Sequence, residues 1–265
     1  MTFSWDIRAR VQFEGDAHVT EDSCGFNGPN AWVIDGATSL LEPLELPAAS
    51  NPQWLAQQLT VILAEGPTDA SRAGVRSLLA GALSAIDQIA VPLVGEERVR
   101  FPSAAISVAQ LNSDGVEVAS LADCTVVVRT SDGVTHLVRA GDADARVDLE
   151  ASRRTVDAAE RRALLIRDRE LRNTPGNLWV ARRELDAADH AHVVQLSQPE
   201  LMVMASDGAW RAVDLGIVSG PEEFLARTST TLDALGLMHE LRVKQAEIGE
   251  VADDATVLTL SPKRS

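Results

Sequence analysis

Four apolar runs in this chain each meet a carboxylate at one end, and this repeated arrangement limits the folds that the chain can adopt. A buried strand is the simplest structure for a short apolar run, and the end of a strand can leave its carboxylate in water. If such strands share a sheet or a sandwich, their acids can converge at one rim. The four pairs are Trp32–Ile34 with Asp35, Val118–Leu121 with Asp123, Leu201–Ser206 with Asp207, and Ala255–Leu260 with Asp253.

Carboxylates gathered at one rim would repel one another, and a cation among them would relieve that repulsion. Glu21 and Asp22 add a further acidic point just upstream of the first pair. Apart from Cys124, no histidine or cysteine belongs to this set, so its ligands are oxygens, which favours Mg²⁺ or Mn²⁺ over zinc. Any one of these sites could be simple turn chemistry, because Asp-Gly is common after a strand. Four together favour a metal centre.

The composition is that of an ordinary globular protein. The 265 residues, 45% of them hydrophobic and 24% charged, can build a large core, and without a linker or repeat we expect one domain over residues 1–265. The net charge of −15 disfavours binding to nucleic acid or to an anionic membrane. We find no apolar stretch that approaches a membrane span and no signal peptide, so we expect a cytoplasmic protein. Cys24 and Cys124 form no metal-binding or disulfide pattern and are expected to be reduced.

Alternating and helical patterns predict an α+β layered sandwich. Ser4–Phe13 alternates as a half-buried strand does, and we expect it to lie beside the Trp32–Ile34 strand. Short apolar runs separated by Asp-Gly turns between residues 103 and 139 predict an antiparallel meander, which argues against a purely parallel sheet. Helices are predicted from Asn51-Pro52, from Thr68-Asp69, over Val156–Leu171, after Gly220-Pro221 and over Leu232–Ile248, and further short strands at Leu178–Val180 and His192–Leu196.

One segment carries the opposite charge to the rest of the chain. Between Arg153 and Arg183 there are nine arginines and four acids. A solvated helix face is the usual explanation for such a run. The alternative is a docking surface that steers a phosphorylated partner towards an otherwise acidic protein.

The order of these motifs resembles that of the metal-dependent protein phosphatase 2C family, also called PPM. The shared features run from Glu21 to Asp253 and include Ala-Ser-Asp-Gly-Ala-Trp at 205–210 and Asp-Asp-Ala-Thr at 253–256. The chain looks most like compact bacterial members, which carry Asp-Gly-Ala-Thr, here at 35–38, and Asn-x-Pro-Gly-x-x-Trp-Val, here at 173–180. The resemblance implies a four-layer αββα sandwich, with helices flanking two central antiparallel sheets and a binuclear Mn²⁺ or Mg²⁺ site at one end.

The resemblance also implies which residues hold the two ions. Asp35 would bridge both metals, and the carbonyl of Gly36 would bind one of them. Glu21 would serve that same metal, mostly through water. Asp207 and Asp253 would complete the other site.

Other acids take different roles in this comparison. Asp22 would orient the attacking water, and Asp254 is second to Asp253 as a ligand. Asp123 matches a residue that helps to bind a third, looser ion. Arg211, however, occupies the position where an aspartate would support that ion, which argues against a third site.

Two departures concern the substrate phosphate. The family usually has an arginine that grips the phosphate four residues before the glutamate, and this chain has Ala17 there. The adjacent His18 could take that role, although a plain exposed histidine is the competing interpretation. Ala37 stands where some members carry a histidine proposed as general acid, so the leaving oxygen would take its proton from water.

These implications lead to a Mn²⁺- or Mg²⁺-dependent serine/threonine protein phosphatase as the first hypothesis. Such an enzyme hydrolyses phosphate monoesters by direct attack of a water that bridges two metals, without a phosphoenzyme. The alternative is a catalytically weak, phosphatase-like protein that binds a phosphorylated partner. A hydrolase for small phosphorylated metabolites would use the same site. The expected partner is a phosphorylated protein that the sequence does not name, and the oligomeric state stays open, with a monomer as one option.

Overall fold

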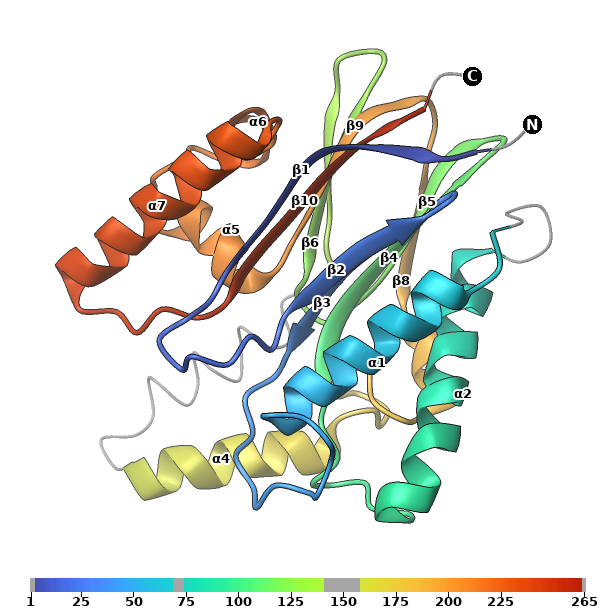
Figure 1. Ribbon diagram of the computed structural model, residues 1–265, viewed down its shortest axis with the longest axis vertical. Helices are drawn as coiled ribbons and strands as arrows, with labels where there is room; N and C mark the ends of the chain where they lie inside the picture. Colours follow the sequence, from blue (N-terminus) through green and yellow to red (C-terminus); the bar gives the residue numbers. More distant parts are fainter. Residues whose placement is uncertain (1–2, 69–73, 141–157, 264–265) are drawn as a thin grey trace.

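The computed structural model describes residues 3–68, 74–140 and 158–263, and its centre is a pair of five-stranded antiparallel sheets (Figure 1). The first sheet has the strand order β1-β10-β9-β6-β7, and the second has the order β2-β3-β4-β5-β8. The strands of the first sheet are β1 (Trp5–Phe13), β10 (Ala255–Pro262), β9 (Pro199–Ala205), β6 (Thr125–Thr130) and β7 (Thr135–Val138). Those of the second are β2 (Ser23–Asn27), β3 (Asn30–Gly36), β4 (Ala104–Asn112), β5 (Gly115–Leu121) and β8 (His192–Leu196).

Helices cover the outer face of each sheet (Figure 1). On the second sheet lie α1 (Asn51–Glu65) and α2 (Val75–Val94), and η1 (Leu185–His190), a short 3₁₀ helix, packs against α2. On the first sheet lie α5 (Asp207–Asp214), α6 (Pro221–Arg227) and α7 (Thr231–Ile248). The predicted four-layer αββα sandwich is therefore confirmed.

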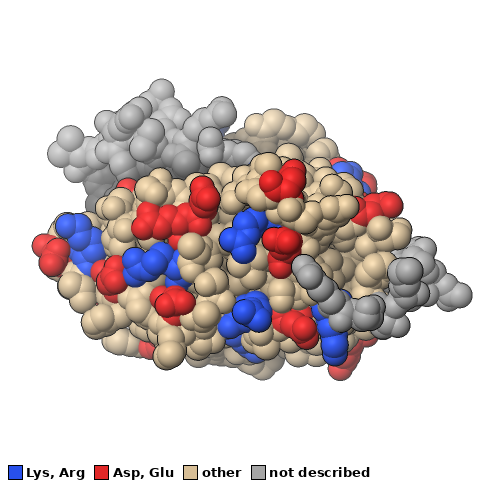
Figure 2. Space-filling view, turned by 90° about the horizontal axis from the view of Figure 1, so that it is seen from above, with Lys and Arg blue, Asp and Glu red and all other residues tan. Residues whose placement is uncertain are grey.

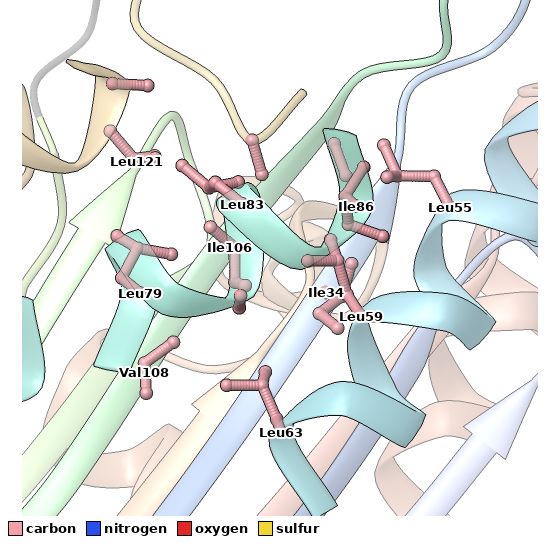
Figure 3. Packing of buried hydrophobic residues seen from close by; sticks show 14 of the residues in the cluster. Ile34, Leu55, Leu59, Leu63, Leu79, Leu83, Ile86, Ile106, Val108 and Leu121 are labelled. Carbon is pink, nitrogen blue, oxygen red and sulfur yellow. The ribbon is translucent and has the colours of Figure 1, made fainter. Parts of the chain in front are cut away.

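Strand β3 shows how one short run serves two cores. Its first five residues are all buried, because the strand has neighbours on both faces. Trp32 and Ile34 point into the cluster under α1 and α2, whereas Val33 points into the cluster between the two sheets. Figure 3 shows Ile34 beside Leu59 of α1, with Ile86 of α2 close by. A strand buried on both sides reads as a continuous apolar run, which is the pattern that the sequence presents.

Helix α1, which covers the second sheet, begins as the sequence predicts. Ser50 caps α1, since its Oγ accepts a hydrogen bond from the Gln53 backbone nitrogen at 3.2 Å, and Pro52 lies in the first turn. The predicted start of the next helix at Asp69 lies outside the described residues, and α2 is described from Val75 onward.

By length and composition alone, α2 could cross a membrane, because an 18-residue stretch of it has a mean hydropathy of 1.6. The expectation that no apolar stretch approaches that length is therefore wrong. In the fold its face of Leu79, Leu83 and Ile86 is fully buried in the cluster over the second sheet. A core helix of a folded domain meets the same criterion.

Two expected strand pairings are wrong. Strand β1 does not lie beside β3, because Ser23–Asn27 forms an additional strand, β2, which makes a hairpin with β3 through Gly28-Pro29. The run from 103 to 139 is not one meander either: β4 pairs with β5 in the second sheet, and β6 pairs with β7 in the first. The chain crosses between the sheets at Ala122–Cys124, where Ala122 adopts a positive φ of 60°. This crossing takes Asp123 to the end of the sandwich.

Two smaller expectations also change. Leu178–Val180 is not a strand; the chain there makes only one bridge, between Ala181 and Ala104. The sequence interpretation gave no helix directly after Asp207-Gly208, yet α5 begins at Asp207.

A further helix, α4 (Ala158–Leu171), lies across the lower end of the sandwich in Figure 1 and covers neither sheet face. Its predicted first residue, Val156, lies outside the described residues. Arg162 Nη2 donates a hydrogen bond to the Leu40 carbonyl at 2.8 Å, which ties α4 to the loop after β3. The end of the sandwich beneath that loop is where the acidic strand ends meet.

The opposite end of the molecule carries mixed charge. Figure 2 views the molecule from the top of Figure 1 and shows acidic and basic side chains interspersed on that face. The net charge of −15 is therefore not displayed there as one acidic patch.

Candidate metal centre

Segments that are distant in the sequence converge on one cavity of about 250 Å³ at the α4 end of the sandwich. Asp35 and Gly36 enter it from the end of β3, and Asp123 from the crossing between the sheets. Asp207 enters from the first turn of α5, and Asp253 from the segment just before β10. The structure thus brings together the acids of all four apolar runs.

Direct contacts join the two sheets at this point. The backbone nitrogen of Asp207 donates a hydrogen bond to Asp35 Oδ2 at 3.2 Å, so the end of β3 and the start of α5 are held together. Gly36 lies so close to the β1–β2 loop that a Cβ on it would stand 2.6 Å from the Glu21 carbonyl oxygen. Any larger residue at position 36 would push the Glu21 segment away from the cavity.

Asp254 has a structural role that separates it from Asp253. Its carboxylate accepts hydrogen bonds from the backbone nitrogens of Gly15 at 2.7 Å and Glu21 at 2.5 Å. The β1–β2 loop is therefore fastened to the segment before β10. A Cβ on Gly15 would lie 2.6 Å from the Ala252 carbonyl oxygen, so the loop can approach this closely only with glycine. With both oxygens of Asp254 used in this way, Asp253 is the acid that faces the cavity.

The acids raise one another's pKa. The pKa of Asp35 lies well above its usual range, first because the surroundings exclude water and then because Asp207, Asp22 and Asp123 are negatively charged. Loss of water also raises the pKa of Asp22 to about 8 and that of Asp207 to about 6, with neighbouring aspartates adding to both. The pKa of Asp253 is raised as well, mainly by burial. Like charges are thus concentrated here without enough positive charge to balance them.

This donor set fits hard divalent cations. All the side-chain donors are carboxylates, which Mg²⁺ and Mn²⁺ prefer. Asp22 Oδ2 is buried and has no hydrogen-bond donor among the described residues. Within the described part of the chain, no three acidic, histidine or cysteine side chains are already grouped closely enough to hold an ion. Binding would therefore draw side chains inward on a backbone that already converges.

The remaining predicted site residues lie around the cavity. Glu21 is half-buried beside it, and burial raises its pKa. Asp22 is buried, with 7% of its surface exposed, and does not line the cavity wall. The His18 side chain is 84% exposed, pairs with Glu14 at 3.0 Å and does not line the cavity either. Its assignment to phosphate binding stays a prediction that this position does not favour.

Arg211 is engaged away from the cavity. Its guanidinium makes two hydrogen bonds to Glu250, at 2.9 and 2.7 Å, and these lower the pKa of Glu250 to about 2. This pairing joins α5 to the segment after α7. A cation at this position does not favour an additional metal ion beside Asp207.

Part of the arginine-rich segment is structural, and a docking surface stays a prediction for its exposed arginines. Arg172, Arg182 and Arg183 are buried, with at most 7% of their surface exposed. They pair respectively with Asp168 at 3.0 Å, Glu184 at 2.6 Å and Asp87 at 2.8 Å. The first two arginines of the run, at 153 and 154, lie outside the described residues.

Two arginines of α4 and its C-terminal end, Arg169 and Arg172, line the cavity itself. The sequence interpretation placed this basic run beside the active site as a segment that steers phosphorylated substrates, with Arg161, Arg162 and Arg169 as the residues to test, but it did not single out Arg172. The spacing of Asp168 and Arg172, four residues apart on a helix, was the available signal, since such a pair marks a helix face that is held in place.

Comparison with known proteins gives the fold its context. No protein-family model matches the chain, and no curated protein matches its sequence at a significant level. Solved structures do match, over nearly the whole of both chains. The serine/threonine phosphatase PstP/Ppp of Mycobacterium tuberculosis aligns over 98% of this chain and 99% of its own, with a TM-score of 0.63 and 13% identity. The protein has the PPM phosphatase fold.

Other solved structures with the PPM fold agree. The PPM Ser-Thr phosphatase MsPP of Mycobacterium smegmatis aligns over 97% of this chain and 99% of its own, with a TM-score of 0.56 and 15% identity. The catalytic domain of PstP in complex with two manganese ions covers 99% of each chain, with a TM-score of 0.56 and 12% identity. The resemblance that the motifs indicated therefore holds for the fold.

Proposed function

We propose that this protein is a Mn²⁺- or Mg²⁺-dependent phosphatase that hydrolyses phosphoserine and phosphothreonine in proteins. One observation carries the proposal: four aspartates from four separate segments face one cavity and raise one another's pKa. Carboxylates are not expected to gather in this way in a folded protein unless a cation balances them. The manganese-bound PstP structure, which shares the fold, supports the same assignment.

Asp35, Asp207 and Asp253 would hold the two ions, with the Gly36 carbonyl and Glu21 on the side of the β1–β2 loop. When bound, such a pair of ions supplies an activated water at neutral pH and neutralises charge on the phosphoryl oxygens. Asp22, buried behind the cavity, would orient the attacking water. Asp123 would stay at the cavity wall as an additional anionic group.

No side chain of this protein is needed as a covalent nucleophile. Burial raises the pKa of Cys24 to about 11 and also raises that of Cys124 well above its usual range, so neither thiol ionises near neutral pH. Ala37 lines the cavity and offers no proton to the leaving group. Direct attack by water is therefore the mechanism that these residues support best.

The first test is hydrolysis of p-nitrophenyl phosphate by the purified protein in EDTA, Mg²⁺ or Mn²⁺, beside the Asp35→Asn variant. Turnover that depends on the metal and is lost in the variant is expected. A panel of phosphoserine, phosphothreonine and phosphotyrosine peptides and small phosphorylated metabolites would then identify the substrate class. Turnover unaffected by EDTA would contradict the proposal.

A phosphatase-like binding protein is the second candidate, and two observations favour it. The described acids are not yet grouped closely enough to hold an ion, and Ala17 supplies no cation beside the phosphate. In that case calorimetry should detect binding of Mn²⁺ and of a phosphopeptide while no phosphate is released.

A further inference from the structure

A phosphate dianion that enters this cavity needs a cationic group from the protein, and the loop beside the acids does not supply one. The β1–β2 loop, from Glu14 to Asp22, contains no lysine or arginine. Among the described residues that line the cavity, the only cations are Arg169 and Arg172. Both come from the same short stretch at the end of α4, on the wall formed by that helix.

Arg172 is fixed in the wall. Its Nε donates to Asp168 Oδ2 at 3.0 Å, and its Nη1 donates to Ser103 Oγ at 2.9 Å. Only 8% of its side chain is exposed. Arg172 therefore anchors the end of α4 to the start of β4 and brings positive charge to the base of the cavity.

Arg169 lies one turn earlier and is half-buried. It lines the cavity and also a small pocket beside it, which Leu40 and Ser103 help to form, so it lies where the two adjoin. Its charge reaches the acidic side of the cavity, because it lowers the pKa of Glu21 against the larger effect of burial. The backbone at this point is also held, since Arg182 Nη1 donates to the Arg169 carbonyl at 3.4 Å.

Charge balance explains why Arg169 matters once ions are bound. The cavity is lined by five carboxylates, those of Asp35, Asp123, Asp168, Asp207 and Asp253, and by two guanidinium groups. Glu21 and Asp22 lie next to this cavity and add to the negative charge, so two divalent ions and two guanidinium groups would offset most of it without leaving a positive excess. Without Arg169 the loaded cavity would be more negative and would attract an anion less.

We propose that Arg169 binds the phosphate group of the substrate, with Arg172 positioning the helix that carries it. The planar guanidinium can donate two parallel hydrogen bonds to phosphate oxygens, which a lysine cannot reproduce. The recognition element of the site is therefore on α4 and not on the β1–β2 loop. This inference rests on the proposed function for its substrate, but phosphate binding can be measured without turnover.

The test measures binding of inorganic phosphate to the full-length, Mn²⁺-loaded protein by calorimetry, together with KM and kcat for p-nitrophenyl phosphate. The variants are Arg169→Ala and Arg169→Lys, with Arg167→Ala as the matched control, because Arg167 is an exposed arginine of the same helix that does not line the cavity. Mn²⁺ affinity and the thermal midpoint are recorded for each variant, so that loss of folding or of metal is detected separately.

We expect Arg169→Ala to weaken phosphate binding and to raise KM roughly 10- to 100-fold, the usual range for loss of a charge-assisted hydrogen bond, with Mn²⁺ affinity unchanged. Phosphate affinity and KM of Arg169→Lys should lie between those of the wild type and those of Arg169→Ala. The values for Arg167→Ala should match the wild type. Phosphate affinity in Arg169→Ala within about twofold of wild type would overturn the inference. A fall in Mn²⁺ affinity in Arg169→Ala as large as the fall in phosphate affinity would also overturn it, since Arg169 would then act on the metal ligands.

The two proposals fail in different ways. Wild-type protein that binds phosphate through Arg169 but releases none from any substrate would overturn the phosphatase assignment and uphold this inference. Metal-dependent turnover with phosphate binding unaffected by Arg169→Ala would uphold the phosphatase assignment and overturn this inference. Wild-type protein that binds no phosphate in the presence of Mn²⁺ would overturn the role of Arg169 outright.

Discussion

Two sets of charged residues lie at the same end of this molecule, and the protein treats them in opposite ways. The acidic cluster consists of Glu21, Asp22, Asp35, Asp123, Asp207 and Asp253. The arginine network consists of Arg172, Arg182 and Arg183 with their partners Asp168, Glu184 and Asp87. In the network each charge has an opposite charge within 3.0 Å, whereas in the cluster the nearest charges are largely of the same sign.

The pKa values reflect this difference. Burial opposes ionisation of Glu184, but the hydrogen bonds and charge of Arg182 hold its pKa below the usual range. Asp35 has no such partner, and its pKa is raised. A buried pair completed within the chain fixes geometry, and a group of unbalanced acids disfavours the folded state until a cation arrives. The network thus acts as a structural frame, and the cluster is the candidate metal site.

Removing a charge from the cluster should give the largest change in activity and the smallest harm to folding. In Asp35→Asn the amide oxygen can still accept the hydrogen bond from the Asp207 nitrogen, but the carboxylate that we propose as a metal ligand is lost. We expect metal-dependent turnover to fall by at least about 100-fold, while the metal-free protein stays as stable as wild type or becomes more stable. Thermal unfolding in EDTA, with Asp6→Asn at an exposed position of β1 as control, checks the expected stability. Clear destabilisation of metal-free Asp35→Asn would mean that repulsion among the acids does not destabilise the folded wild-type protein.

Removing a charge from the arginine network should instead give the larger loss of stability and the smaller change in activity. Arg182 is 1% exposed, and its Nε and Nη2 both donate to Glu184. Arg182→Ala would leave that carboxylate without its main partner, and we expect a loss of about 3–5 kcal/mol in unfolding free energy. Arg98 also donates to Glu184, but its side chain is 47% exposed. Arg98→Ala should therefore cost about 1 kcal/mol or less, and equal losses in urea unfolding would contradict the frame interpretation.

A change of pH should distinguish the acidic cluster from the arginine network without mutation. The pKa of Asp207 rises from 3.8 to about 6 on folding, so its proton stabilises the folded state fully below pH 3.8 and this contribution is lost as the pH rises through 6. Asp22, at about 8, extends the same trend. In EDTA we expect the unfolding free energy to fall by several kcal/mol between pH 5 and pH 8, of which Asp207 alone accounts for roughly 1.4 kcal/mol. Mn²⁺ should reverse the fall and release protons, which calorimetry in two buffers measures; no proton release at pH 7 would argue against the raised pKa values.

A smaller effect is expected from weakening the hydrogen bonds by which Asp254 holds the β1–β2 loop beside the acidic cluster. Asp254→Asn keeps one acceptor oxygen but turns an amide nitrogen towards one of the two backbone nitrogens, of Gly15 or Glu21. We expect a loss of about 1–2 kcal/mol in stability and a modest fall in metal affinity. If Asp254 were itself the ligand in place of Asp253, metal affinity would fall as far as in Asp253→Asn, so the two variants are measured together.

The smallest effect is expected at His18. Because its exposed side chain pairs with Glu14 and stands apart from the cavity wall, His18→Ala should change stability by less than about 0.5 kcal/mol. KM for p-nitrophenyl phosphate should stay at the wild-type value. A large rise in KM would restore the sequence-based assignment of phosphate binding to this residue and weaken the case for Arg169.

Much of the site could be predicted because the signals are local. Asp35, Asp123, Asp207 and Asp253 each adjoin an apolar run, and a run of that kind ends at the rim of a layered sandwich wherever it is placed. The order of the strands in the sheets could not be predicted in the same way. The short strand Ser23–Asn27 has a weak pattern, and missing it put β1 beside β3 although they belong to different sheets.

The sequence by itself determined the layered α+β class, the strand ends that carry acids and the type of ion that they suit, because periodicity and donor chemistry are properties of neighbouring residues. Only the tertiary structure decided which arginines of the basic run are structural and which face the cavity. Arg182 and Arg169 belong to the same run, yet one is buried against Glu184 and the other lines the site. That distinction depends on contacts between segments far apart in the chain, such as Arg162 with Leu40 and Arg172 with Ser103, which no local pattern encodes.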